Sequence, residues 1–224
     1  MAHPDDVIVF YGYLIHQLRQ DNKDVYVLLG TNGARGSRDN DISEAELAKK
    51  RIAEETAALK ALGVAADKLF CLGYADGEME SDLKLIGEIS YYLRKYKIDI
   101  VCTHEPTLQY LPTHAKDGYF VQHRDHRKIG EAVIDAVYPF SRDRSFFPEH
   151  YVEGIEPYEI YDILLTDEKE ANFILDFTEN VEIKRQAMRA HQSQFSEETI
   201  TDILNVFSEN GRNLEKSHYL KLRW

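Results

Sequence analysis

Three short apolar runs lie in the first half of the chain, at residues 25–29, 69–72 and 98–102. Each run is continuous and not alternating, which is typical of strands buried on both faces of a parallel sheet. Cys71 and Cys102 lie inside the second and third runs, so both are expected to be small core residues. A further strand is predicted at residues 159–165.

Helical patterns lie between and after these runs. Residues 43–62 begin at a Ser with a Glu three residues later, stop at Gly63 and carry an apolar stripe, which together make a complete helix signal. The stripe consists of Ala48, Ile52, Leu59 and Leu62. Further helices are predicted at residues 81–95, 125–137, 179–191 and 197–207.

The alternation of strands and helices predicts an α/β fold, a Rossmann-like open and mostly parallel sheet with helices on both faces. With 224 residues, of which 43% are hydrophobic, the chain is expected to form a single domain over residues 1–224. Residues 106–122 lack a period and are predicted to be a long loop, which in a compact domain is often functional.

Charge and cysteine content narrow the class of partner. The 39 acidic and 27 basic residues give a net charge of -12, which repels phosphate backbones and anionic membrane surfaces. Nucleic acid and membrane partners are therefore not expected. No basic and apolar leader opens the chain, no run approaches the ~20 apolar residues of a membrane span, and only two cysteines occur, so a cytoplasmic location is expected.

Polar residues gather where the predicted strands end. In an open α/β sheet, ligands bind beyond the carboxyl ends of the strands, so residues that follow a strand are the first candidates. The segments at residues 3–6, 31–36, 76–77 and 123–126 are of this kind. Their histidines and carboxylates are the donors that a divalent metal takes.

The order of these segments carries a resemblance to a known family. AHPDD stands at residues 2–6, TNGARG at 31–36, LGYADGE at 72–78 and H-x-D-H at 123–126. A helical pattern and a late signature accompany them, formed by Arg51, Glu54, Ala58, Leu62 and Gly63 and by Lys184, His191, Ser193 and Gln194. On these residues, which cover most of the chain, the sequence resembles the LmbE-like or PIG-L-type de-N-acetylases. AHPDD together with H-x-D-H is the specific part of the match.

The resemblance implies a zinc-dependent hydrolase that removes an N-acetyl group from an amino sugar or an amino-sugar conjugate. The implied zinc ligands are His3, Asp6 and His126, and ferrous iron would also fit such a donor set. Asp5 is implied as the general base, and His123 as the group that assists the oxyanion and the leaving nitrogen. Asp125 is implied to fix the tautomer of His123. Arg51 and Asp76 are implied to bind the substrate.

Each assignment has a plainer alternative. His-Pro-Asp-Asp is ordinarily a turn, and Asp76 before Gly77 can be one too. Residues 123–126 can be an exposed helix start that Asp125 caps. Arg51 can form an exposed pair with Glu55 one helical turn away. His191 is expected to be structural.

Two departures from the family pattern leave a second function open. Only Met1 and Ala2 precede His3, so the family's first strand is missing from this sequence, as in a fragment or a chain with a misplaced start, and Val7 stands where the family has a Glu. A noncatalytic sugar-binding or metal-binding relative is therefore the alternative. A nucleotide-binding module built on Gly33 and Gly36 is weaker, because the glycine spacing is wrong. A homo-oligomer stays open.

Overall fold

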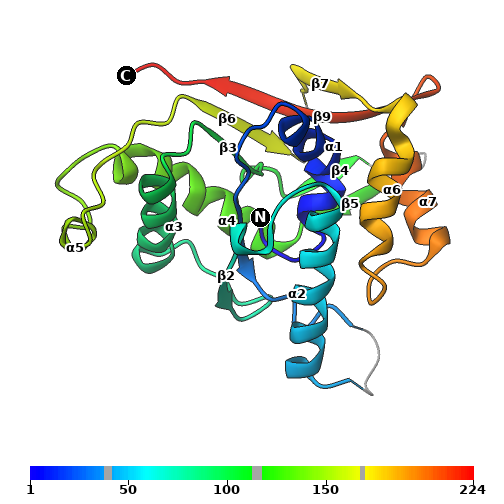
Figure 1. Ribbon diagram of the computed structural model, residues 1–224, viewed down its shortest axis with the longest axis horizontal. Coiled ribbons are helices and arrows are strands. Elements are labelled where there is room, and N and C mark those ends of the chain that lie inside the picture. The colour runs from blue at the N-terminus through cyan, green and yellow to red at the C-terminus, as the bar shows by residue number, and fades with distance from the viewer. Residues whose placement is uncertain (38–41, 113–117, 167–169) are drawn as a thin grey trace. The chain divides into compact units, whose positions relative to one another are not determined.

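We describe the protein from a computed structural model, which describes residues 1–37, 42–112, 118–166 and 170–224. Helices and strands follow one another along the chain (Figure 1). The chain divides into two compact units, a first unit of residues 1–78 and 174–216 and a second unit of residues 79–173 and 217–224. A single domain over residues 1–224 stays a prediction.

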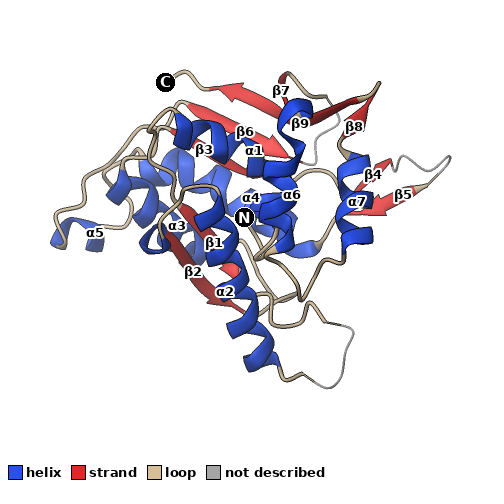
Figure 2. Ribbon diagram, turned by 45° about the vertical axis from the view of Figure 1, so that its right-hand side comes forward, coloured by secondary structure: helices blue, strands red, loops and turns tan. Residues whose placement is uncertain are grey.

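The first unit contains a parallel pair of strands, β1 (Val27–Thr31) and β2 (Leu69–Tyr74), which lie side by side in Figure 2. Its other elements are α1 (Asp6–Gln20), α2 (Glu44–Ala61), η1 (Ala66–Lys68), η3 (Thr178–Asn180), α6 (Val181–Arg189), α7 (Glu197–Val206) and β8 (Ser208–Glu209). The main chain of Met1 and Ala2 runs beside β1, because the N–H groups of Gly30 and Thr31 donate to their carbonyls over 3.0 and 2.9 Å. His3 therefore lies just beyond the carboxyl end of β1.

The helix α2 begins and ends where the sequence predicts. Ser43 Oγ accepts the N–H of Glu46 over 3.3 Å, and the Glu46 carboxylate accepts the N–H of Ser43 over 3.2 Å. This reciprocal cap satisfies two main-chain donors at the start of the helix. Gly63 follows the other end at φ 86, a conformation that glycine adopts without the strain a Cβ brings.

The buried face of α2 differs from the predicted apolar stripe. Ala48 and Ile52 are only half-buried, whereas Arg51, Glu54 and Glu55 are buried. A helix that turns charged side chains inward must supply partners for them, because an unpaired buried charge is strongly destabilising. These partners belong to the candidate site.

The helix α1 was missed from sequence, where residues 3–6 suggest a turn. It begins at Asp6, directly after that turn, and buries an apolar face. In its middle, the Glu215 carboxylate accepts the N–H groups of Tyr13 and Leu14 over 2.7 and 2.9 Å, and Lys184 donates to the same carboxylate over 2.8 Å. The strand β9 spans Arg212–Lys221. The buried ion pair between Lys184 of α6 and Glu215 of β9 thus anchors the middle of α1.

The second unit is built around the parallel pair of β3 (Ile100–His104) and β6 (Asp162–Thr166). Its other elements are α3 (Leu83–Tyr96), β4 (Tyr110–Pro112), β5 (Tyr119–Val121), α4 (Arg124–Asp135), the π-helix η2 (Ala136–Ser141) and α5 (Glu149–Val152). Residues 218–221 of β9 pair antiparallel with β6. The division between the units falls within β9 and within β7 (Phe173–Asp176).

The predicted strands therefore pair in parallel, β1 with β2 and β3 with β6, and the predicted α/β fold with a mostly parallel sheet is confirmed. The antiparallel pairs involve strands that were not predicted. Residues 106–122 were wrongly predicted to be only a loop, since β4 and β5 pair there. Cys71 was wrongly expected in the core: it is exposed, because β2 turns alternate side chains outward, and Cys102 is half-buried.

A buried arginine organises one part of the second unit. Arg94 on α3 is 1% exposed, and its guanidinium donates to the carbonyls of Ser141, Phe140, Asp143 and Phe146 over 2.7 to 3.2 Å. Burial lowers the pKa of Arg94. The Arg94 guanidinium thus fixes the main chain at the end of η2 and in the residues that follow it.

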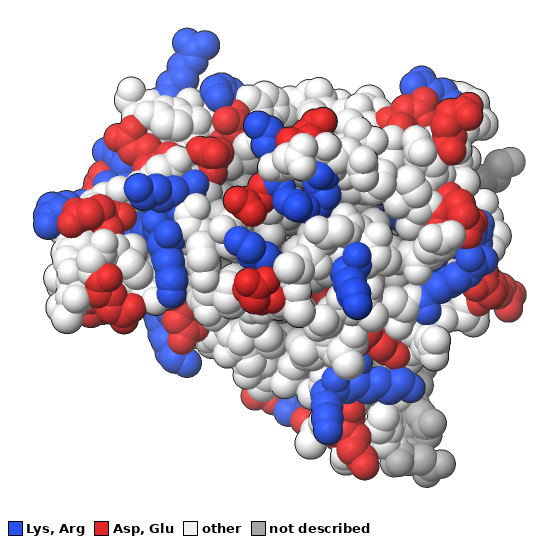
Figure 3. Space-filling view, viewed as in Figure 1, with Lys and Arg blue, Asp and Glu red and all other residues white. Residues whose placement is uncertain are grey.

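Among the described helices, none is both long enough and apolar enough to cross a membrane. Basic and acidic side chains are interspersed on the face that Figure 3 shows.

Candidate functional site

In the first unit, His3 lies between two buried carboxylates. Asp6 Oδ2 accepts the main-chain N–H of His3 over 2.7 Å and lies 3.3 Å from its Nδ1. Asp76 Oδ1 lies 3.3 Å from Nε2 on the other side of the ring. A histidine whose ring nitrogens face carboxylates has a fixed orientation, which is the arrangement that supports imidazole as a metal ligand.

Asp5 occupies the turn between His3 and α1 with a positive φ of 99°. Its N–H donates to Glu55 Oε2 over 3.2 Å, and its Oδ1 lies 3.0 Å from Arg51 Nη2. Burial, opposed by the charge of Arg51 and reinforced by Asp6, raises the pKa of Asp5 to about 7. A carboxyl group that titrates near neutral pH can both accept and return a proton.

Arg51 fills the space beneath the glycine loop that follows β1. It is 3% exposed and donates to the carbonyls of Gly33 and Pro4 over 2.9 and 2.6 Å. A Cβ at Gly33 or Gly36 would overlap its guanidinium. The alternative of an exposed pair with Glu55 is wrong, because both side chains are buried. A phosphate could not use these glycines without displacing Arg51, and substrate binding by Arg51 stays a prediction.

Asp76 is buried at the end of β2, where Gly77 turns the chain at φ 83. Burial alone would raise the pKa of Asp76, but the contact with His3 and the N–H of Arg35, which donates over 3.1 Å, hold it below its usual value. Asp76 therefore keeps an anionic carboxylate. Contact with substrate stays a prediction for this residue.

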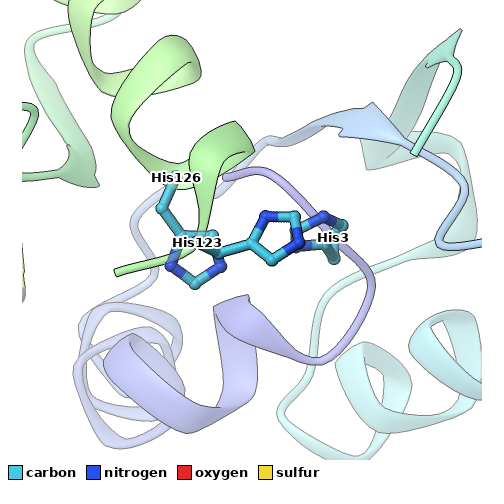
Figure 4. A group of neighbouring side chains, drawn as sticks. All are labelled: His3, His123 and His126. Carbon is cyan, nitrogen blue, oxygen red and sulfur yellow. The ribbon is translucent and has the colours of Figure 1, made fainter. Parts of the chain in front are cut away.

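In the second unit, the first turn of α4 carries the H-x-D-H residues. Figure 4 shows His123 and His126 at this turn and also labels His3, which belongs to the first unit. The rings of His123 and His126 lie 5.5 Å apart, and His123 is exposed while His126 and Asp125 are buried. His123 is itself the cap of α4, since its Nδ1 accepts the N–H of Asp125 over 3.1 Å. The alternative in which Asp125 caps the helix is therefore wrong.

His104 belongs beside these residues and was missed from sequence. It ends β3, is fully buried and stacks on His126 with ring centroids 3.8 Å apart. A Cβ at Gly130 would overlap the carbonyl of His104, so only glycine lets α4 lie this close to β3. The signal was present in the sequence, because His104 lies two residues after the apolar run at residues 98–102.

The donors fit a divalent metal. Each unit brings together pairs whose ligand atoms lie within 4.8 Å of each other, His3 with Asp76 in the first and His126 with either His123 or His104 in the second. Imidazole nitrogen with carboxylate oxygen is the donor chemistry that zinc and ferrous iron take. The structure thus assembles two groups of predicted site residues, one in each unit.

The chain belongs to the family of GlcNAc-PI de-N-acetylases, PIG-L, whose model matches residues 1–137. Among its relatives is the diacetylchitobiose deacetylase of Thermococcus kodakarensis, which is 32% identical over 196 residues, covering 88% of this chain and 68% of the relative. The predicted family is thereby confirmed.

Solved structures agree with the fold. The N,N'-diacetylchitobiose deacetylase of Pyrococcus horikoshii, solved with its inhibitor MPG, matches with a TM-score of 0.83 and 28% identity over 98% of this chain and 81% of its own. GalB of Pseudomonas putida, a 4-carboxy-2-hydroxymuconate hydratase, matches with a TM-score of 0.75 over 100% of this chain and 95% of its own. At 17% identity, GalB shares the fold alone. The activity must therefore be argued from the site residues.

Proposed function

We propose that this protein is a metal-dependent hydrolase that removes the acetyl group from an N-acetylated amino sugar or its conjugate. The observation that carries the proposal is the paired Asp5 and Asp6 at the start of α1, one held by Arg51 and the other by His3. Two adjacent carboxylates with different partners can divide the labour of binding a metal and moving a proton.

The proposed metal ligands are His3, Asp6 and His126, with zinc as the first choice and ferrous iron as the second. The metal, when bound by three protein groups, supplies an open position at which a water becomes acidic enough to react near neutral pH. The orientation of His3 between Asp6 and Asp76 supports this ligand set. So does the close stacking of His126 on His104, which limits how its ring can turn.

Asp5 accepts the proton of the attacking water in this proposal. Its raised pKa of about 7 suits the task, since a base works best when its pKa lies near the working pH. The ion pair with Arg51 points one carboxylate oxygen in a fixed direction. The proposal assigns the second oxygen to the attacking water.

His123 donates a hydrogen bond to the developing oxyanion and, when its ring is protonated, a proton to the leaving nitrogen. Because its Nδ1 accepts the N–H of Asp125, the proton of the neutral ring lies on Nε2, at the exposed side of α4. Asp125 thereby fixes the tautomer through its main chain. A positioned donor of this kind is worth about 10² to 10³ in turnover.

The proposed substrate follows from the relatives, whose names specify diacetylchitobiose as the compound deacetylated. Asp76, held anionic at the end of β2, is suited to accept hydrogen bonds from sugar hydroxyls. Arg51 contacts substrate only if part of its guanidinium turns from the main chain, and its Nε has no partner among the described residues. A cytoplasmic location remains part of the proposal.

Acetate release tests the proposal. The purified protein is stripped of metal, reloaded with zinc or ferrous iron, and supplied with N-acetylglucosamine, diacetylchitobiose and an N-acetylglucosamine conjugate. Metal-dependent release of acetate from at least one of them is expected. Stoichiometric metal without turnover on the whole panel would favour the noncatalytic alternative instead.

A further inference from the structure

Two neighbouring glutamates of α2 reach the loop that follows α6. Glu54 accepts the N–H of Ser193 over 2.9 Å and its hydroxyl over 2.6 Å. Glu55 Oε2 lies 3.1 Å from Nε2 of His191, and both of these side chains are fully buried. The late H-x-S-Q signature of the sequence is therefore a docking point for α2.

Glu55 links this loop to Asp5. The same oxygen that faces His191 accepts the main-chain N–H of Asp5 over 3.2 Å. Asp5 has φ 99 and ψ -38, and a residue with a Cβ adopts a positive φ only when its surroundings enforce it. The Glu55 carboxylate holds the N–H of this strained residue.

Arg51 holds Asp5 from the other end. Its Nη2 contacts both the Asp5 carboxylate and the carbonyl of Pro4, which belongs to the same peptide group as the Asp5 N–H. One turn of α2 thus holds the Pro4–Asp5 peptide group at both ends. Arg51 binds its oxygen and the Asp5 carboxylate, and Glu55 accepts its N–H. Both grips come from buried charged groups, so they persist where an exposed pair would be screened.

We propose that Glu55, which lies beside His191, is a positioning residue for Asp5: it fixes the main chain of the residue that accepts the proton. This inference rests on the proposed function, because it assigns Asp5 the role of base. A carboxylate buried only to pack α2 would be a costly choice, since an apolar residue of similar volume stabilises as well or better.

Three variants test the positioning role at matched metal content. Glu55→Ala lowers kcat by about 10- to 100-fold, the usual loss when a group that orients a reacting residue is removed, with KM changed less than about twofold. Glu55→Gln restores most of kcat, because its amide oxygen still accepts the Asp5 N–H. The matched control is Glu54→Gln, which alters the neighbouring glutamate that contacts Ser193 and not Asp5, and keeps kcat close to wild type.

A double-mutant cycle separates positioning from a loss of structure. In an Asp5→Asn background, Glu55→Ala should cause little further loss of kcat, since the base it positions is already gone. Equal losses from Glu55→Ala in both backgrounds would overturn the proposal. So would a loss of kcat from Glu54→Gln as large as that from Glu55→Ala.

Amide hydrogen exchange tests the contact without any turnover. In Glu55→Ala the Asp5 amide should exchange up to about tenfold faster, because a hydrogen bond worth about 1 kcal/mol is lost, while Glu54→Gln leaves it unchanged. An unchanged Asp5 amide in Glu55→Ala overturns the inference. If the wild-type protein releases no acetate, the proposed function fails, and a changed amide still establishes the grip on Asp5.

Discussion

Arg51 and Arg94 are two buried arginines, 3% and 1% exposed, that the structure uses in different ways. Arg94 contacts main-chain carbonyls and the ring of His150, and within the described residues no carboxylate pairs with it. Arg51 also contacts carbonyls, but it pairs with the Asp5 carboxylate. Burial alone therefore does not distinguish a structural arginine from one at a candidate site.

The neighbours of each arginine make the distinction. Arg94 contacts four carbonyls within residues 140–146, so its effect is to fix that segment. Arg51 contacts a residue of unfavourable φ whose carboxyl group has a pKa of about 7. Strain and a shifted pKa at one residue are typical of functional sites, because nothing in the fold alone requires them. Four predictions test this contrast.

The largest effect is expected from Asp5→Asn. The amide keeps the volume and can still face Arg51, but it cannot accept a proton at neutral pH. At matched metal occupancy, kcat for acetate release should fall by at least about a hundredfold, within the usual 10² to 10⁴ for a general base. Near wild-type turnover would remove Asp5 from the mechanism and leave Arg51 as structural as Arg94.

His123→Ala should follow, with a loss of about 10² to 10³ in kcat and the metal retained, since this imidazole is assigned to the transition state. Metal analysis of the same sample provides the control. Loss of metal from the variant would mean that the roles of His123 and His126 are exchanged.

The two arginines are then compared directly as Arg94→Met and Arg51→Met. Arg94→Met should lower the free energy of unfolding by about 2 to 4 kcal/mol, since several buried carbonyls lose their donor, with little change in kcat. Arg51→Met should lower kcat by about 10- to 100-fold at matched metal content. Urea unfolding and acetate release, measured on both variants, would contradict the comparison if the two effects were reversed.

Much of the fold could be predicted from local signals. The Ser43 cap, Gly63 and the apolar runs gave α2 and the parallel strands within a few residues. α1 could not be predicted in the same way, because Pro4 and the two aspartates are strong turn formers and mask the start of the helix that follows them. β9 was also missed.

The candidate site divides along similar lines. The motif residues His3, Asp5 and Asp6 were named from sequence. In the first unit His3 contacts Asp6 and Asp5 contacts Arg51, and the roles of these residues stay predictions. Glu54 was named only as part of the family's helical pattern and Glu55 only as an exposed partner of Arg51. Their burial was not predicted, because a polar face that turns inward leaves no apolar stripe in the sequence. The contact between Glu55 and His191 could not be predicted locally, because His191 lies far along the chain.

The smallest expected effect concerns pH and the metal-free protein. The groups that face Asp5 are Arg51, Asp6, His191 and His3, with Glu55 at its N–H. Because burial outweighs Arg51, the folded-state pKa of Asp5 is about 7, above the ordinary 3.8. The folded protein thus binds more protons than the unfolded chain between these values, and its stability must fall as pH rises through that window.

Asp5→Asn removes this contribution and supplies the measurement. With metal chelated, urea unfolding of wild type and variant is compared at pH 6 and pH 7, where Asp5 is ionised in the unfolded chain and holds its proton more tightly in the folded protein. The stability margin of the Asn variant over wild type should widen between these two pH values by on the order of 1 kcal/mol, close to what one pH unit inside this window is worth. If the margin did not widen between pH 6 and pH 7, the ion pair would outweigh burial. Asp5 would then be ionised well below neutral pH, and its suitability as a base would rest on Arg51 yielding the carboxylate to the attacking water.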